Sequence, residues 1–258
     1  MILDEILANK RQEVARRRHE VDVDALPPPR LFAAALRQPG VSVIAEFKRR
    51  SPSGGTIRQD ATPSDIGRVY AANGAAAMSV LTDERYFGGT DVDLQKARST
   101  SGLPVLRKDF VVDAYQVYEA RAIGADAVLL IVRALEDAML RSLLQLTRDL
   151  GMAALVEAHS EDEVRRALNA GAQIVGVNNR DLDTLVTDVS LAPRLRSLVP
   201  ASCVFVAESG VSTPEHVRVL ADHGVDAVLI GEALLRADDP GARLAELVTA
   251  GAYRSAAA

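Results

Sequence analysis

The stretch IGADAVLLIV, at residues 123–132, contains the junction on which the fold prediction rests. Gly124 follows a segment of helical periodicity, and glycine readily adopts the positive φ that ends a helix. The apolar run after it is nearly continuous, which is typical of a strand buried on both faces of a parallel sheet. Similar junctions recur at Gly74, Gly171 and Gly224. Their spacing of about 50 residues leaves room for two strand-and-helix units between successive junctions.

The rest of the chain repeats this alternation of apolar runs and longer amphipathic segments. The runs lie at residues 41–47, 76–81, 104–110, 126–132, 153–159, 173–179, 203–209 and 226–232. Eight strand-and-helix units predict an α/β fold of the (β/α)8 TIM-barrel type. A doubly wound sheet is the alternative, but that fold more often has a glycine-rich loop after its first strand.

The chain length suits a single barrel domain preceded by an N-terminal helical extension. We assign residues 1–40 to the extension, 41–250 to the barrel and 251–258 to a frayed tail. Apolar residues at helical spacing predict one helix over residues 2–20 and a second, short helix over 31–37. We expect the first helix to cover the barrel mouth as a partial lid, so that deletion of residues 1–40 raises KM.

Composition excludes several classes of partner. The net charge of −5 and the pI near 5.5 argue against a nucleic-acid or anionic-membrane partner. No apolar run reaches the roughly 18 residues of a membrane span, and the charged first residues do not resemble a signal peptide. A single cysteine, Cys203, allows no internal disulfide. We therefore expect a cytoplasmic protein that is a monomer or a weak homodimer.

Charged residues gather where the expected strands end, and TIM barrels build their active sites at these carboxyl ends. Two of the chain's four lysines, Lys48 and Lys108, stand there with Glu46, Glu157 and Glu208. Because an unpaired carboxylate beside an apolar stretch is costly, a solvated surface role for the whole set is disfavoured. Clustered lysines and glutamates shift one another's pKa values, which is typical of acid–base catalysis.

Two further features indicate what such a site binds. Gly210 and Gly231 follow the last two runs, where TIM barrels bind phosphate with loop amides. Phe87 and Phe110 stand in strand-end loops and favour a pocket for an aromatic ring, although core positions are the alternative. The loop SPSGG at residues 51–55 is by itself typical of a flexible loop.

The four histidines show no metal-ligand spacing, so no metal site is expected. His159 lies two residues after Glu157 and is a candidate to orient that carboxylate, although a structural or surface role is the favoured interpretation. Cys203 opens an apolar run and is expected in the core.

Five ordered motifs resemble those of the indole-3-glycerol phosphate synthase family. They are Ile44-Ala45-Glu46-Phe47-Lys48 with Ser51-Pro52-Ser53, Leu106-Arg107-Lys108-Asp109-Phe110, Leu155-Val156-Glu157 with His159, Val177-Asn178-Asn179-Arg180-Asp181-Leu182, and Ala207-Glu208-Ser209-Gly210-Val211. The match runs through nearly the whole chain. It implies a cofactor-free enzyme that converts 1-(o-carboxyphenylamino)-1-deoxyribulose 5-phosphate into indole-3-glycerol phosphate, carbon dioxide and water in tryptophan biosynthesis.

The resemblance also implies roles for individual residues. Lys108 would be a general acid at the sugar carbonyl, Glu157 a general base, and Lys48 an acid or carboxylate partner in the dehydration. Glu46 would hold the lysines in register, while the division of acid and base roles among the other three stays open. The remaining implied residues bind and orient substrate (Asn178, Arg180, Glu208, Ser209), surround its phosphate (Ser51, Gly210, Ile230, Gly231, Glu232) or pack around its anthranilate ring (Pro52, Phe87, Phe110, Leu129, Leu185).

The chemistry of this reaction needs groups of these kinds. The ring carbon attacks a carbonyl whose oxygen must be protonated, and decarboxylation then restores aromaticity without an electron sink. Loss of water needs an acid, and removal of the anilino proton needs a base. A buried lysine with a lowered pKa and a buried glutamate with a raised pKa would suit these steps near pH 7.

The sequence departs from the family pattern at a few positions. Arg49-Arg50 is bulkier than the small residue expected before Ser51, and Gly54-Gly55 loosens the same loop. Ala158 replaces a β-branched residue between Glu157 and His159. These changes are expected to affect loop mobility and packing rather than the chemical groups.

Three alternative functions remain. A phosphosugar isomerase of similar fold would need a cysteine or aspartate acid–base pair, and Cys203 stands at the wrong end of its run. A Schiff-base aldolase would use Lys108 as its nucleophile. A non-catalytic or engineered barrel scaffold would gain stability by losing the charged set, so its retention argues against that alternative.

Overall fold

The computed structural model describes residues 2–23, 26–181 and 183–252, and eight of its strands form a closed barrel. They are β1 (Ser42–Phe47), β4 (Ala77–Leu81), β5 (Val105–Lys108), β6 (Ala127–Ile131), β7 (Ala153–Ala158), β8 (Ile174–Asn178), β9 (Val204–Glu208) and β10 (Ala227–Ile230). Neighbouring strands are parallel, in the order β1-β10-β9-β8-β7-β6-β5-β4. Each lies within a predicted apolar run, so the (β/α)8 prediction is confirmed and the doubly wound alternative is wrong.

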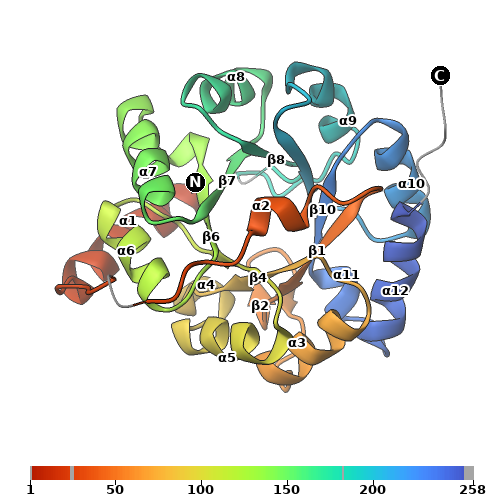
Figure 1. Cartoon of the computed structure of the whole chain (residues 1–258), viewed down its shortest axis with the longest axis horizontal. Helices are drawn as coiled ribbons and strands as arrows, with labels where there is room; N and C mark the ends of the chain where they lie inside the picture. The colour runs from red at the N-terminus through yellow and green to blue at the C-terminus, as the bar shows by residue number, and fades with distance from the viewer. Residues whose placement is uncertain (1, 24–25, 182, 253–258) are drawn as a thin grey trace.

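A ring of helices surrounds the barrel (Figure 1). The longer ones are α3 (Pro63–Ala72), α5 (Asp91–Ser101), α6 (Ala114–Ala122), α7 (Asp137–Asp149), α8 (Glu161–Asn169), α10 (Pro214–Asp222) and α12 (Pro240–Gly251). Short elements in the connections are β2 (Arg50–Ser51), β3 (Gly55–Thr56), α4 (Glu84–Phe87), η1 (Val132–Ala134), α9 (Leu191–Leu195), η2 (Arg196–Leu198) and α11 (Glu232–Leu235). The glycine junctions behave as predicted: φ at Gly124 is 89°, and the next N–H, of Ala125, donates to Ala120 O at 2.8 Å.

Alternation along each strand separates two layers of side chains. On β1, Val43, Ala45 and Phe47 pack under the helices, whereas Ile44 points into the barrel. Glu46 is the next inward position, because strand side chains alternate between faces. The same step of two residues leads from Leu106 to Lys108, from Leu155 to Glu157 and from Val206 to Glu208. The barrel interior is therefore apolar along most of its length and charged where the strands end.

The N-terminal extension contacts both ends of the barrel. Helix α2 (Phe32–Ala35) lies across the end at which the strands begin (Figure 1), where Phe32 and Leu36 join the interior apolar cluster. Helix α1 (Ile2–Arg17) lies at the other end, where Ile2 and Ile6 line a cavity. The lid position agrees with the expectation, and both helices are shorter than predicted.

Buried ion pairs fasten α1 to the barrel. Lys10 is only 1% exposed, and its Nζ lies 2.9 Å from both Asp83 and Asp109 and 3.0 Å from Glu13. Burial alone would lower the pKa of Lys10, but these carboxylates outweigh it and raise the pKa. Asp109 directly follows Lys108, the last residue of β5. Helix α1 is therefore anchored at the edge of the charged layer, which consists of Glu46, Lys48, Lys108, Glu157 and Glu208.

Some expectations lie outside what the structure tests. Leu182 and residues 253–258, most of the expected tail, are outside the described residues. The assignment of one domain with its boundaries stays a prediction. Within the described part of the chain, no helix combines the length and apolar character needed to cross a membrane.

Candidate active site

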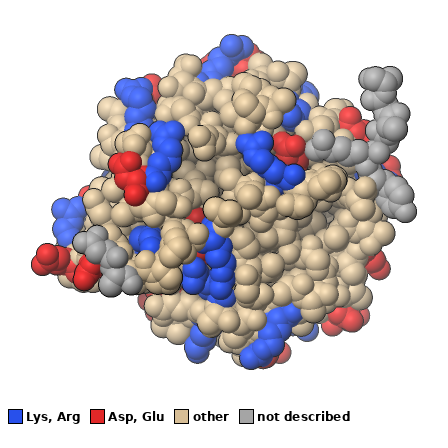
Figure 2. Space-filling model, viewed as in Figure 1, with Lys and Arg blue, Asp and Glu red and all other residues tan. Residues whose placement is uncertain are grey.

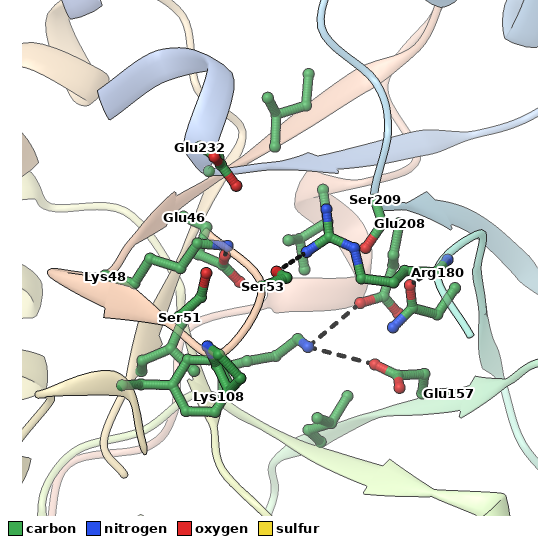
Figure 3. Close-up of a pocket in the computed structure, with 18 of the residues that line it drawn as sticks. Glu46, Lys48, Ser51, Ser53, Lys108, Glu157, Arg180, Glu208, Ser209 and Glu232 are labelled. Atoms are coloured by element: carbon green, nitrogen blue, oxygen red, sulfur yellow. Dashed lines mark hydrogen bonds and ion pairs between the residues drawn. The ribbon is translucent and has the colours of Figure 1, made fainter. Parts of the chain in front are cut away.

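All eighteen predicted site residues line one cavity at the carboxyl ends of the strands. Its volume of about 440 Å³ falls in the range of small-molecule sites. Figure 3 shows Lys108 directed toward Glu157 and Glu208, with Glu46 and Lys48 on another side of the same space. The structure thus brings together predicted residues from seven of the eight barrel strands.

Lys108 lies between two carboxylates. Its Nζ is 3.3 Å from Glu157 Oε2 and 3.5 Å from Glu208 Oε2. Burial would lower the pKa of Lys108, but Glu157, Glu208 and Glu46 outweigh burial and raise the pKa above its ordinary value. The expected lowering of a lysine pKa is therefore wrong for Lys108. The amine is held as an ammonium ion, which donates protons and does not act as a free base.

A second ion pair stands on β1. Lys48 Nζ lies 2.6 Å from Glu46 Oε1, and Ser79 Oγ donates to Glu46 Oε2 at 3.4 Å. Burial would raise the pKa of Glu46, but Lys48 and then Lys108 lower it below its usual value. Glu46 is therefore a buried anion in contact with one site lysine and in the field of the other.

The two remaining carboxyl groups titrate differently. Burial would raise the pKa of Glu157, but Lys108, and after it His159, hold the pKa below its usual value. Burial and the nearby Glu157 charge raise the pKa of Glu208 to about 8. Neither oxygen of Glu208 has a well-formed hydrogen bond within the described part of the chain. The raised glutamate pKa expected from sequence therefore belongs to Glu208, whereas Glu157 is the ionised group.

Glu208→Gln is expected to stabilise the substrate-free protein at alkaline pH. The Glu208 carboxyl titrates near 4.5 in the unfolded chain and near 8 in the folded chain. Between these values the folded form holds a proton that the unfolded form has released, so the parent loses stability as pH rises through this window. Glutamine does not titrate, and each pKa unit corresponds to about 1.4 kcal/mol. We expect a gain above about 1 kcal/mol near pH 9.

Urea unfolding at several pH values checks this expectation. Glu215→Gln is the matched control, because Glu215 is an exposed residue of α10 paired only with Arg218 in the described part of the chain. A stability difference between the Glu208→Gln variant and the parent that stays constant from about pH 5 to 9 would contradict the assignment.

Two glycines make room for the carboxylates. A Cβ on Gly176 would lie 2.3 Å from Glu208 Oε1, and one on Gly231 would lie 2.6 Å from Glu46 Oε1. Gly231 was predicted as a phosphate neighbour, and Gly176 was missed. A glycine inside an apolar strand often marks close approach by another group, so the position of Gly176 in its apolar run could have indicated this contact.

An apolar wall faces the charged groups. The rings of Phe87 and Phe110 lie with their centroids 6.2 Å apart. Pro52, Leu129 and Leu185 line the same cavity as these rings. Lid residues Ile2, Leu3 and Ile6 also line it, and the sequence analysis did not assign them to the site. The wall therefore combines strand-end loops with α1.

The loop after β1 is fastened across the cavity instead of lying free. Arg180 Nη1 donates to Ser53 Oγ at 2.5 Å, and Arg236 Nη2 donates to Gly54 O at 2.6 Å. Ser51 Oγ accepts from Gly54 N at 2.9 Å. Ser53 and Arg236 were missed, because nothing local in the sequence marks partners 127 or 182 residues apart.

Two of the departures from the family pattern, Arg49 and Arg50, are not among the described residues that line the cavity. Arg49 makes a bidentate ion pair with Asp93, at 2.6 and 2.8 Å. Arg50 donates to the backbone oxygens of Glu84 and Arg85, both at 2.8 Å. These arginines therefore tie the β1 strand end to the loop after β4.

Comparison with solved structures supports the fold alone. A mandelate oxidase structure has a TM-score of 0.62 and 16% identity, covering 96% of this chain and 82% of that one. Thiamine phosphate pyrophosphorylase from Pyrococcus furiosus has a TM-score of 0.61 and 17% identity, covering 81% of this chain and 95% of that one.

Sequence comparison is more specific. A family model described as indole-3-glycerol phosphate synthase matches residues 3–247. The indole-3-glycerol phosphate synthase of Roseiflexus sp. (strain RS-1) is 49% identical, over 95% of this chain and 97% of its own length. Indole-3-glycerol phosphate synthase 2 of Streptomyces coelicolor is 55% identical, over 87% of each chain. The match covers every strand of the barrel and the residues of its charged layer, and the chain therefore belongs to the indole-3-glycerol phosphate synthase family.

Proposed function

We propose that this chain closes, decarboxylates and dehydrates 1-(o-carboxyphenylamino)-1-deoxyribulose 5-phosphate to indole-3-glycerol phosphate, as a step of tryptophan biosynthesis. The observation that carries the proposal is the position of Lys108, an ammonium between the buried carboxyl groups of Glu157 and Glu208 and beside an aromatic wall. Such a site presents a proton donor, a base and an apolar surface to one small molecule.

In ring closure, Lys108 is the general acid. Attack of the ring carbon turns the carbonyl oxygen into an alkoxide, which takes a proton from the ammonium. Glu208 carries its own proton below about pH 8, and its Oε2 lies 3.5 Å from Lys108 Nζ. This carboxyl group is placed to return a proton to the lysine. The rings of Phe87 and Phe110 hold the anthranilate ring, which recovers aromaticity when carbon dioxide leaves.

In the dehydration, Glu157 is the general base and Lys48 the acid or carboxylate partner. The hydroxyl leaves as water when it is protonated, and the double bond of the new ring forms when a base removes a ring proton. Glu157 is ionised, as a base must be. Glu46 contacts Lys48 at 2.6 Å and keeps its ammonium at the cavity wall.

The phosphate is expected near Ser51, Gly210 and Gly231. Gly210 has a φ of 78°, and a Cβ there would lie 2.6 Å from Val189, so glycine is required at this turn. The first N–H groups of α11, after Gly231, have no partner within their own helix. Arg180 and Arg236 line the same cavity and supply positive charge.

The alternative functions fit less well. A Schiff-base aldolase needs a neutral lysine, whereas the carboxylates around Lys108 hold it as an ammonium. For an isomerase, Cys203 precedes β9 and bonds to Ala172 O, at the end of the barrel away from the charged layer. A mere scaffold would leave Glu208 as a buried, poorly bonded carboxyl without a purpose.

We also propose a cytoplasmic monomer or weak homodimer that acts on a small molecule. The net charge is −5, and Figure 2 shows basic groups on the viewed face separated from one another rather than joined in a stripe. Nucleic-acid binding normally needs such a continuous basic surface. Gel filtration combined with light scattering checks the oligomeric state.

Removal of residues 1–18 is expected to raise KM about tenfold, which corresponds to about 1.4 kcal/mol of binding free energy. The change removes the apolar contacts of Ile2 and Ile6 with the cavity. This truncation tests the lid role of α1 more specifically than deletion of residues 1–40, because the longer deletion also removes Phe32 and Leu36 from the barrel interior. Steady-state kinetics should show a smaller change in kcat than in KM.

The control for the truncation keeps the helix and its ion pairs. Ile2→Ala combined with Ile6→Ala removes only apolar contact and should raise KM in the same direction by less. Unchanged kinetics in the truncated but folded chain would rule out the lid role of α1.

The proposed reaction is tested by the fluorescence of the indole product. The anilino sugar phosphate is incubated with the chain, and indole fluorescence is followed with time. Trapping with borohydride in a parallel sample reports any Schiff base on Lys108. Indole formation without trapping supports the proposal, and trapping without indole favours the aldolase.

A further inference from the structure

His159 stands behind Glu157, with a carboxylate at each ring nitrogen. Its side chain is buried, and it directly follows β7, which carries Glu157. Nε2 lies 3.4 Å from Glu157 Oε1, and Nδ1 lies 3.3 Å from Glu163 Oε2. Glu157 Oε2 is the oxygen that faces Lys108. The Glu157 carboxylate therefore lies between Lys108, which Oε2 faces, and the imidazole of His159, which Oε1 faces.

The start of α8 sets this arrangement. Ser160 caps the helix by accepting from Glu163 N at 3.2 Å, which places Glu163 in the first turn. The Glu163 carboxylate reaches back and accepts from His159 N at 2.8 Å. Arg133, in η1, donates to its other oxygen at 3.0 Å. Glu163 is therefore fixed by backbone, imidazole and guanidinium together.

The charge on Glu163 decides which ring nitrogen of His159 must carry a hydrogen. Burial would raise the pKa of Glu163, but hydrogen bonds from His159 and Arg133 outweigh it and hold the pKa at about 2. An ionised carboxylate only accepts hydrogen bonds, so Nδ1 of His159 must carry a hydrogen. Nε2 then faces Glu157 Oε1 and has no hydrogen-bond partner among the described residues. Two lone pairs in that position would repel, and one proton between them removes the repulsion.

We infer that His159 is a positioning residue, which holds a proton on Nε2 toward Glu157 Oε1 and so keeps Glu157 ionised with Oε2 directed toward Lys108. The inference rests on the proposed function of Glu157 as the base. The titratable and charged groups that face this pair are Lys108 of β5, Arg133 of η1, Glu163 of α8 and Glu208 of β9. Arg133 also lies 3.5 Å from Asp181 and 3.4 Å from Asp183, in the loop that carries Arg180.

The pH profile of kcat tests this role. The base must be ionised, so activity falls where Glu157 becomes protonated. Loss of the imidazolium charge in His159→Gln raises the pKa of Glu157, and the acid limb is expected to move to higher pH by about one unit. Glu163→Gln should move it in the same direction, because it removes the anion that favours the protonated imidazole. The double variant should not add the two shifts.

The matched control is His223→Gln, because His223 is exposed and bonds to Val219 O at the end of α10. It should leave the acid limb in place. If His159 has only a structural role, His159→Gln should lower Tm and kcat without moving the acid limb of the kcat–pH profile. That outcome would overturn the inference.

An independent readout does not require turnover. Nitrogen-15 NMR of the full chain near pH 7, assigned by difference with the His159→Gln variant, should show both ring nitrogens of His159 carrying hydrogen. A bare Nε2 would overturn the inference. If the parent forms no indole, the proposed reaction fails, and the nitrogen spectrum still decides the protonation of His159.

Discussion

Lys108→Ala is expected to lower kcat by at least about a hundredfold while the chain stays folded. The variant removes the proton donor from the centre of the charged layer, where Glu157 and Glu208 hold it at 3.3 and 3.5 Å. The attacked carbonyl oxygen then has no positioned acid, and a general acid contributes about 10²–10⁴ in rate. Single-turnover kinetics of indole formation measure the loss directly.

Two companion variants separate proton donation from charge. Lys108→Arg keeps a cation for the carboxylates, but a guanidinium does not release its proton, so it should stay almost as inactive as the alanine variant. Lys96→Ala is the control, because Lys96 is an exposed residue of α5 outside the site. Parent-like kcat in a folded Lys108→Ala chain would remove Lys108 from the mechanism.

Glu157→Gln is expected to lower kcat about a hundredfold or more, because it removes the proton acceptor, whereas Lys108→Ala removes the proton donor. Glutamine keeps the volume and a hydrogen bond to Lys108, but it cannot take up the proton released as the new ring becomes aromatic. The pKa of Glu157 is held below its usual value by Lys108 and His159. The parent should therefore keep its base ionised at neutral and mildly acidic pH, and lose activity only as pH falls through that lowered pKa.

The control for this variant is Glu161→Gln, an exposed change in the first turn of α8. It should leave kcat and the pH profile unchanged. If Glu157→Gln retained most of the parent kcat, the base would have to be another carboxylate of the cavity, such as the ionised Glu46.

The fold was predictable because its signals are local. Glycine junctions such as Gly124 need a positive φ, and apolar runs such as residues 126–132 need burial on two faces. Alternation then places Glu46 and Lys48 on the inner face of one strand, once the direction of the barrel is known. Each of these features depends only on residues that are neighbours along the chain.

The electrostatics of the site were not predictable in the same way. The pKa of Lys108 depends on carboxylates from three other strands, and their closeness outweighs the burial that sequence reasoning relied on. Which glutamate keeps a proton likewise depends on distances, because Glu208 lies beside Glu157 and shares Lys108 with it at the longer distance of 3.5 Å. The buried pairing of Lys10 with Asp83 and Asp109 joins segments that carry no matching local signal.

The most direct test of the account measures two products from one substrate. The anilino sugar phosphate, labelled with carbon-13 in its carboxyl group, is turned over by the parent chain while labelled carbon dioxide and indole are quantified together. We expect one labelled carbon dioxide for every indole formed, and formation of both products at least about a hundredfold more slowly with Lys108→Ala. A folded parent chain that leaves the carboxyl label in the substrate would contradict the proposed reaction.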